Sequence, residues 1–155
     1  MSIPVRFLTR RALLLAATAF LLPFSAAHAQ QGKVPEISPA EARARASAGE
    51  MTLIDVRTPD EWRETGLAPG ATPINMYHPG GAEGFTKDVL TRVGGKRDTP
   101  IAIICRSGNR SSQVQRHLAA QGFTRVYSVS EGMSGSAAGP GWVKRGLPVE
   151  SCKVC

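Results

Sequence analysis

The sequence lacks the motifs on which several large classes of protein depend. It contains no glycine-rich phosphate-binding segment of the P-loop or dinucleotide type, no HExxH zinc helix and no EF-hand loop. Its 16 glycines and 11 prolines among 155 residues are too few for a low-complexity or collagen-like chain. The apolar run from Ala12 to Phe24 is shorter than the roughly 20 residues that a membrane-spanning helix needs. With 42% hydrophobic residues, the sequence predicts one globular domain whose chemistry comes from side chains and loops.

The N-terminal segment predicts export. Three arginines and no acidic residue precede the apolar run, which is followed by Ala27-His28-Ala29. This arrangement is typical of a cleavable secretory signal peptide, here residues 1–29, and we expect a periplasmic or secreted protein without a stable membrane anchor. The adjacent Arg10 and Arg11 also fit a twin-arginine signal, so both export routes agree with the sequence.

The positive charge of the chain does not indicate a nucleic-acid partner. The net charge is +7, but removal of residues 1–29 with their three arginines would leave 16 basic and 12 acidic side chains. The basic residues are scattered, and the aromatic residues do not alternate with them as in a platform that stacks bases. We therefore expect no binding of nucleic acid.

Capping patterns and apolar runs predict alternating strands and helices. Ser38 and Thr58 each precede a proline, with a glutamate three residues after the cap, a pattern typical of a helix N-terminus. We predict helices over 39–48, 59–65, 84–93 and 110–121, and strands over 52–56, 74–76, 100–105 and 126–129. The alternation indicates an α/β sandwich with a mostly parallel sheet. In the resulting division, residues 30–36 form a flexible leader, 37–150 the domain and 151–155 a C-terminal tail.

The strongest candidate for a functional residue is Cys105. It ends the most apolar predicted strand, at the edge where parallel sheets bind ligands, and a helix start follows it closely. The loop 106–111 between them can turn several backbone N–H groups toward an anion, and Gly108 and Asn109 tolerate the left-handed conformations of such a loop. Arg106 and Arg110 add positive charge, so we expect Cys105 to be a thiolate nucleophile at neutral pH. A buried inert thiol is the alternative, and it leaves this clustering unexplained.

Three segments of the chain resemble the rhodanese-like sulfurtransferases. They are Leu53-Ile54-Asp55-Val56-Arg57, Pro69-Gly70-Ala71 and Cys105-Arg106-Ser107-Gly108-Asn109-Arg110-Ser111. The resemblance implies a rhodanese-like three-layer α/β/α sandwich and a catalytic Cys105. This cysteine would take the sulfane sulfur of thiosulfate or a similar small anionic donor, hold it as a persulfide and pass it to cyanide or a thiol acceptor. The substrate-binding residues would be Arg106, Ser107, Gly108, Asn109 and Arg110, with no metal and no organic cofactor.

Loop length and neighbouring residues refine this expectation. Four residues separate Cys105 from Arg110, one fewer than in the phosphatase loop of the same fold, which favours sulfur transfer over phosphatase or arsenate-reductase activity. We expect Asp55 and Arg57 to be structural, with Arg57 paired to Glu61. Glu131 stands where the family commonly has a glycine, and it either faces the pocket or points outward.

The tail contributes the other two cysteines. A Cys152–Cys155 disulfide would form in an oxidising compartment and leave Cys105 free. Alternatively, the tail resolves the persulfide of Cys105, and the chain is a non-enzymatic persulfide carrier or a thiol-redox partner of a periplasmic thiol protein. A rhodanese-fold module that only binds anions is a further alternative. We expect no zinc site, because besides these cysteines only His78 and His117 remain as soft ligands.

Overall fold

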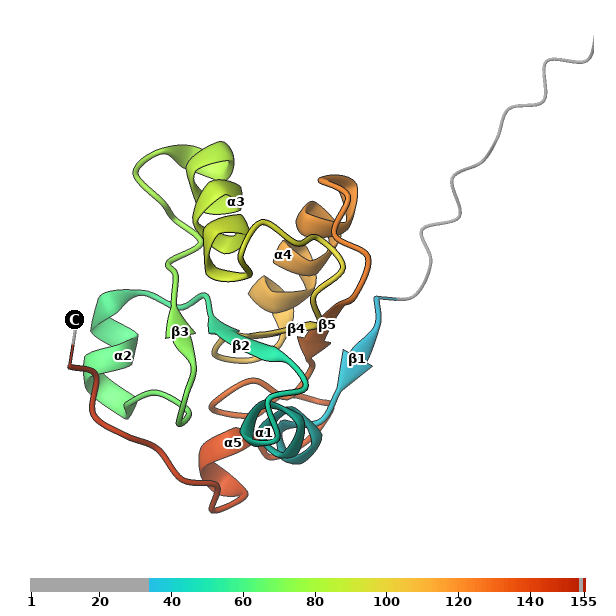
Figure 1. Cartoon of the computed structure of the whole chain (residues 1–155). Coiled ribbons are helices and arrows are strands. Elements are labelled where there is room, and N and C mark those ends of the chain that lie inside the picture. Colours follow the sequence, from blue (N-terminus) through green and yellow to red (C-terminus); the bar gives the residue numbers. More distant parts are fainter. Residues whose placement is uncertain (1–33, 154) are drawn as a thin grey trace, which may run out of the picture. The chain divides into compact units, whose positions relative to one another are not determined.

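The computed structural model describes residues 34–153 and 155. The elements follow one another as β1 (Glu36–Ile37), α1 (Pro39–Ser47), β2 (Thr52–Asp55), α2 (Pro59–Thr65), β3 (Thr72–Pro73), α3 (Gly81–Arg92), β4 (Ile101–Ile104), α4 (Asn109–Ala120), β5 (Val126–Val129) and α5 (Gly141–Lys144). The predicted signal peptide and residues 30–33 of the predicted leader lie outside the described residues. Figure 1 shows the order of the elements and the path of the chain.

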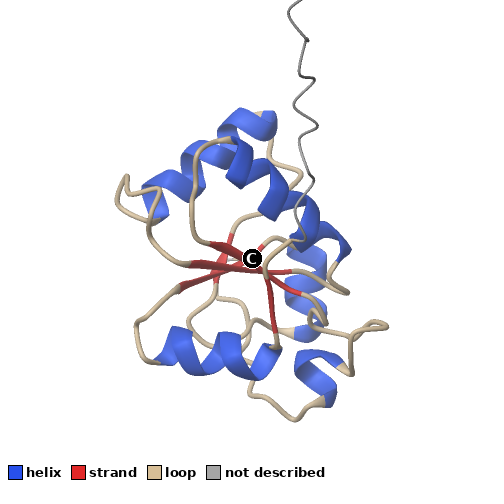
Figure 2. Ribbon diagram, turned by 90° about the vertical axis from the view of Figure 1, so that its right-hand side faces the viewer, coloured by secondary structure: helices blue, strands red, loops and turns tan. Residues whose placement is uncertain are grey.

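The sheet has five strands in the order β1-β5-β4-β2-β3, and every neighbouring pair is parallel. All four residues of β4, the central strand, are buried, as the apolar run predicts. Helices cover both faces of the sheet (Figure 2). The predicted α/β fold with three layers is therefore confirmed.

Alternate residues of β4 point into two separate core layers. Ile101, Ile103 and Cys105 belong to the layer under α3 and α4, which also contains Phe85, Val89, Val114 and Leu118. Ala102 and Ile104 belong to the layer under α1 and α5, together with Ala42, Met133 and Trp142. The period of two along the strand thus places the Cys105 side chain on the side of α4.

Both predicted helix caps are present. The Ser38 hydroxyl accepts a hydrogen bond from Glu41 N at 3.2 Å. Thr58 Oγ1 accepts one from Glu61 N at 3.4 Å, and the Glu61 carboxylate accepts one from Thr58 N at 3.0 Å. This reciprocal pair is a capping box, which starts α2 immediately after β2 ends.

The edges of the sheet differ from the prediction. The strand predicted over 74–76 lies two residues earlier, at Thr72–Pro73, although Ile74 N still donates to Asp55 O at 2.9 Å. Proline has no N–H for a sheet ladder and is tolerated there because β3 is an edge strand. Glu36, assigned to the flexible leader, is part of β1 beside β5. Two residues are too few for a periodic pattern to reveal such a strand.

The helices on the α3/α4 face begin earlier than predicted. The first residue of α3 is Gly81 rather than residue 84, and that of α4 is Asn109 rather than residue 110. Both start without a side-chain cap, so the sequence carries no cap signal at these positions. The four-residue α5 was not predicted, because Gly141 at its start reads as part of a loop.

Candidate active site

Cys105 lies directly after β4 with 1% of its surface exposed. Its Sγ atom accepts hydrogen bonds from the backbone N–H groups of Gly108 at 3.2 Å and Ser111 at 3.4 Å. Ser111 Oγ lies 3.6 Å from the same sulfur. The first N–H groups of a helix have no partner within it, so the start of α4 directs unpaired donors and its positive dipole end toward the sulfur. The sulfur atom therefore lies among hydrogen-bond donors at the start of a helix.

Gly108 shapes the loop around the sulfur. Its φ angle is +90°, and an added Cβ would overlap the carbonyl oxygen of Ser130. Gly132 lies equally close to the loop, since a Cβ there would be 2.5 Å from Arg106 O. Asn109, which would also tolerate a left-handed conformation, is the first helical residue. The conformation of the cradle therefore depends on glycine at two positions.

Arg110 is bound to Glu61 of α2. Its Nη1 and Nη2 atoms donate to the two carboxylate oxygens at 2.7 and 2.5 Å. The hydrogen bonds from Arg110 lower the pKa of Glu61 to about 2 despite partial burial. The same hydrogen bonds with Glu61 raise the pKa of Arg110. The pair neutralises much of the charge that the sequence placed at the site.

The partner that we expected for Glu61 has a different role. Arg57 is buried and donates from Nη2 to Asp55 Oδ2 at 2.7 Å, and its Nε contacts the same carboxylate at 3.0 Å. The remaining donors bind Thr65 Oγ1 and the carbonyl oxygens of Glu61 and Gly66. Arg57 therefore binds the backbone carbonyl of Glu61 and not its carboxylate. Through these hydrogen bonds, Arg57 connects α2 to the end of β2.

Three serine hydroxyls lie behind the sulfur. Ser128 Oγ of β5 is 2.8 Å from Ser111 Oγ and 3.2 Å from Ser112 Oγ. The hydroxyls of Ser111 and Ser112 both lie within hydrogen-bond distance of Gly108 O, at 2.8 and 2.9 Å. Ser111 and Ser128 are completely buried. The network thus joins the sulfur, the loop and β5.

The other predicted substrate-binding residues lie on the open side of the loop. Arg106 and Asn109 are exposed. Ser107, Gly108 and Asn109 line a hollow of about 420 Å³, and Ser136 and its neighbours form the opposite wall. The segment from Ser134 onward is attached to the loop, because Ser134 N donates to Arg106 O at 2.8 Å. We call residues 134–140, which form one wall of this hollow beside the loop, the rim segment.

Glu131 neither faces the pocket nor points into solvent. It is 3% exposed and accepts hydrogen bonds from Arg145 at 2.7 Å and from Gly141 N at 3.0 Å. The pKa of Glu131 is lowered, mainly by Arg145. The carboxylate holds the rim segment where it joins α5.

Sequence reasoning missed Glu61 and Ser128 as parts of the site and gave Ser111 no role of its own. The capping pattern identifies Glu61 as a helix-start residue, but no sequence signal links it to Arg110, 49 residues later. Ser111 was visible as the last residue of the loop motif. Ser128 carries no signal, because a serine in a short strand is equally compatible with many roles.

The tail is folded against α2. The backbone groups of Glu150 and Leu67 exchange two hydrogen bonds of 2.8 and 2.9 Å. The sulfur atoms of Cys152 and Cys155 are bonded to each other, and Arg63 Nη1 donates to the carbonyl oxygen of Cys155 at 2.6 Å. Among the cysteines of the chain, Cys105 is the free one.

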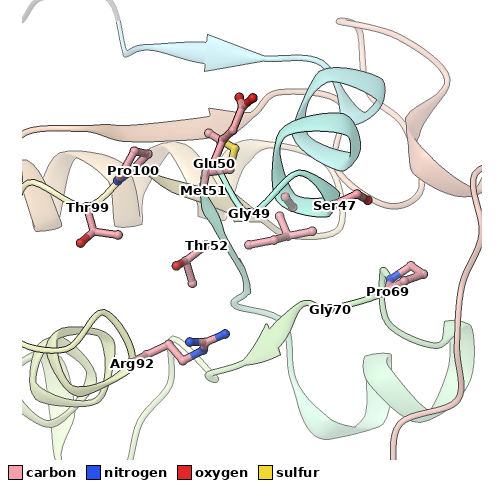
Figure 3. A pocket seen from close by; sticks show the side chains of 12 residues that line it. Ser47, Gly49, Glu50, Met51, Thr52, Pro69, Gly70, Arg92, Thr99 and Pro100 are labelled. Atoms are coloured by element: carbon pink, nitrogen blue, oxygen red, sulfur yellow. The ribbon is translucent and has the colours of Figure 1, made fainter.

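A second cavity lies at the other end of the strands, where β2 and β4 begin, and contains no cysteine. It measures about 390 Å³ and is lined by the end of α1, by residues around the starts of β2 and β4, and by Pro69 and Gly70, with Arg92 at one side (Figure 3). Cys105 follows β4, so the strand separates the two places. Within the described residues, no group of three or more acidic, histidine or cysteine side chains could hold a metal ion. No helix in this part of the chain is long and apolar enough to cross a membrane.

Comparison with known proteins agrees with this geometry. The model of the family described as "Rhodanese-like domain" matches residues 38–138. An uncharacterised protein of Rickettsia prowazekii, RP600, is 31% identical over 98 residues, which are 62% of this chain and 80% of the relative. A protein of Allochromatium vinosum named "Sulfurtransferase" is 30% identical over 104 residues, 67% of this chain and 82% of the relative.

Solved structures show the same fold. Rv0390 from M. tuberculosis has a TM-score of 0.62 at 27% identity, over 77% of this chain and 98% of the other. A polysulfide-sulfur transferase from Wolinella succinogenes has a TM-score of 0.58 at 22% identity, over 78% and 81% of the two chains. At this lower identity, the second likeness concerns the fold alone.

Proposed function

Since the chain belongs to the rhodanese-like domain family, we propose that it is a sulfurtransferase that carries sulfur as a persulfide on Cys105. The observation that carries the proposal is the buried sulfur atom with two backbone N–H donors at the start of α4. The relative named "Sulfurtransferase" supports the same type of activity. The proposed donor is thiosulfate, and the proposed acceptor is cyanide or a thiol.

The reaction would proceed in two displacements on sulfur. The Cys105 thiolate attacks the sulfane sulfur of thiosulfate, the S–S bond of the donor breaks, and sulfite leaves with the electron pair of that bond. The acceptor then attacks the outer sulfur of the persulfide and regenerates the thiolate. With cyanide the product is thiocyanate. Such a covalent intermediate divides one difficult transfer into two easier ones.

The loop would stabilise the negative charge on Cys105 Sγ before it attacks the donor and again as the acceptor removes the outer sulfur. Gly108 N and Ser111 N already contact Sγ, and donors that are fixed before the reaction need no reorganisation during it. The exposed Arg106 would attract the anionic donor. Arg110 would keep N–H groups beyond those used by Glu61, and these would orient the sulfonate of the donor.

The serine network would let the Ser111 hydroxyl change its hydrogen-bond acceptor when the sulfur changes charge. While Cys105 is a thiol, the Ser111 hydroxyl donates to Gly108 O. When the sulfur is anionic, the hydroxyl can turn toward Sγ, because Ser112 still donates to Gly108 O. Ser128 then donates to Ser111 Oγ. No buried hydroxyl loses its partner in either state, which avoids the cost of an unsatisfied polar group.

The N-terminal sequence supports an exported location for this activity. A positively charged start, an apolar run and Ala27-His28-Ala29 are typical of a cleaved signal peptide. We therefore propose that the sulfur donor and the acceptor meet the protein in the periplasm or outside the cell.

Thiocyanate formation from thiosulfate and cyanide tests the proposal. With the tail disulfide intact, the chain should form thiocyanate over repeated turnovers, and its mass after thiosulfate alone should rise by one sulfur atom. Cys105→Ser should remove both signals and keep the circular dichroism spectrum. Arg110→Lys should raise KM for thiosulfate about tenfold, because lysine cannot hold both Glu61 and a sulfonate in a planar array. Arg116→Lys, at an exposed position of α4, is the matched control. Absence of the sulfur adduct would refute persulfide chemistry.

A further inference from the structure

The two C-terminal cysteines have no role in the proposed transfer, although the chain has only three cysteines. Their sulfur atoms are bonded to each other, and the third cysteine is free and buried in the sulfur cradle. Cys155 is exposed and Cys152 is partly exposed. A pair of sulfur atoms that solvent can reach is open to reduction and to thiol exchange.

This disulfide does not cross-link the domain. Among the described residues, Glu150 is the last that forms backbone–backbone hydrogen bonds with the domain, two of them with Leu67. Both cysteines follow it and are three residues apart. A disulfide stabilises a fold by restricting the unfolded chain, and a ring this small restricts only the tail. We therefore expect a chemical rather than a structural role for the pair.

The tail and the catalytic loop are attached to the same helix. Glu61 of α2 holds Arg110 of the loop, and Arg63, two residues further on, donates to the carbonyl oxygen of Cys155. Figure 1 shows the C-terminal segment running along α2. The side chain of Arg63 is half exposed, so its hydrogen bond is easily exchanged for water. Released from it, the five residues after Glu150 can extend about 17 Å.

We propose that Cys152 and Cys155, in the dithiol form, are an internal acceptor that reduces the persulfide of Cys105 and releases sulfide. This inference rests on the proposed sulfurtransferase activity. It assigns the acceptor side of that activity to the chain itself, so that neither cyanide nor a free thiol is needed for one turnover.

The reaction balances without a further oxidant. One tail thiolate attacks the outer sulfur of the Cys105 persulfide, and the Cys105 thiolate leaves with the electron pair of the broken S–S bond. The second tail thiolate then attacks the Cys152 or Cys155 sulfur that carries the transferred atom and expels hydrosulfide. The two tail thiols lose two electrons and form the disulfide, and the sulfane sulfur gains both. An external protein dithiol would reduce the tail again.

The CxxC spacing suits the release of sulfide by the second tail thiol. The attacking group is the thiolate of one of the two cysteines. The nearby partner thiol then resolves any sulfur that the first one takes up, because the two are held in one short ring. The structure contains the product of this step, the Cys152–Cys155 disulfide.

A single-turnover experiment tests the proposal. The chain is reduced, the reductant is removed without oxygen, and one equivalent of thiosulfate is added with no other thiol. We expect about one sulfide and one sulfite per chain and a newly formed tail disulfide, as identified by peptide mass mapping. The double variant Cys152→Ser/Cys155→Ser should release sulfite, retain the sulfur on Cys105 and release no sulfide. Each single variant, Cys152→Ser or Cys155→Ser, should release no sulfide, because the remaining tail thiol has no partner to expel it.

Failure of this inference is distinguishable from failure of the proposed function. Thiocyanate formation with cyanide should be unchanged in the double variant, which keeps the whole cradle. If the wild-type chain forms thiocyanate but retains its persulfide without sulfide release, the tail is not an acceptor. Equal sulfide release by the double variant would also overturn the proposal. If no chain acquires sulfur from thiosulfate, the proposed function itself fails.

Discussion

Replacing Glu61 by glutamine should separate the electrostatic part of the site from its helix cap. Glutamine at the third helical position can still accept from the cap residue and donate back to it, so the start of α2 should persist. The variant removes the negative charge that Arg110 binds at 2.5 and 2.7 Å. The change in stability therefore reports mainly on the ion pair.

The magnitude follows from the pKa of Glu61, which falls from 4.5 to about 2. At about 1.4 kcal/mol per pH unit, this difference corresponds to about 3 kcal/mol of preference for the carboxylate in the folded state. The two side chains are 18% and 19% exposed, and screening by solvent brings the measurable value nearer to about 2 kcal/mol. Because the folded pKa is the lower one, this stability is present above pH 4.5 and is lost as the pH falls toward 2.

Urea denaturation of the wild type and of Glu61→Gln across this pH range is the assay. At pH 7 the variant should be less stable by about 2 kcal/mol, and the gap should narrow between pH 4.5 and pH 2. Glu64→Gln, at an exposed position of the same helix, is the control for loss of a carboxylate without this pair. A difference in the free energy of unfolding that stays constant down to pH 2 would refute the assigned role of Glu61.

Three further substitutions probe the loop and its supports. Gly108→Ala should abolish thiocyanate formation and destabilise the fold by about 1 to 3 kcal/mol in thermal denaturation, because φ is +90° and the methyl group would meet Ser130 O. Arg57→Lys should cost about 3 kcal/mol in urea denaturation, since one ammonium group cannot replace the donors that bind Asp55, Thr65 and Gly66. Ser128→Ala should lower kcat about fivefold and slow alkylation of the thiol, with KM for thiosulfate unchanged; unchanged kcat would exclude the hydroxyl network from the reaction.

The central elements could be predicted because local signals coincide with burial there. The apolar run that forms β4 is buried on both faces, and the two serine or threonine caps place the starts of α1 and α2. At the sheet edges these signals are absent. β1 and β3 have two residues each, and their extended conformation is set by the neighbouring strands rather than by their own pattern.

The nucleophile could be placed from sequence for a similar reason. A cysteine at the end of a central strand, followed by glycine and a helix start, is a local arrangement, and the structure retains it. The pairing of charges is not local. Arg57 has three carboxylates within four residues, those of Asp55, Asp60 and Glu61. Only the folded chain shows that Arg57 binds Asp55 while Arg110 binds Glu61.

The ion pair between Arg110 and Glu61 changes which groups of the loop can bind an anion. The sequence suggests two arginines beside the sulfur, but Arg110 is largely neutralised by Glu61. Of the charged groups of the loop, Arg106 is then the exposed one, and its attraction is the kind that salt screens. The N–H groups of Gly108 and Ser111 act in a buried site, where screening is weak. Donor capture should therefore depend on ionic strength, whereas the stability of the bound persulfide should not.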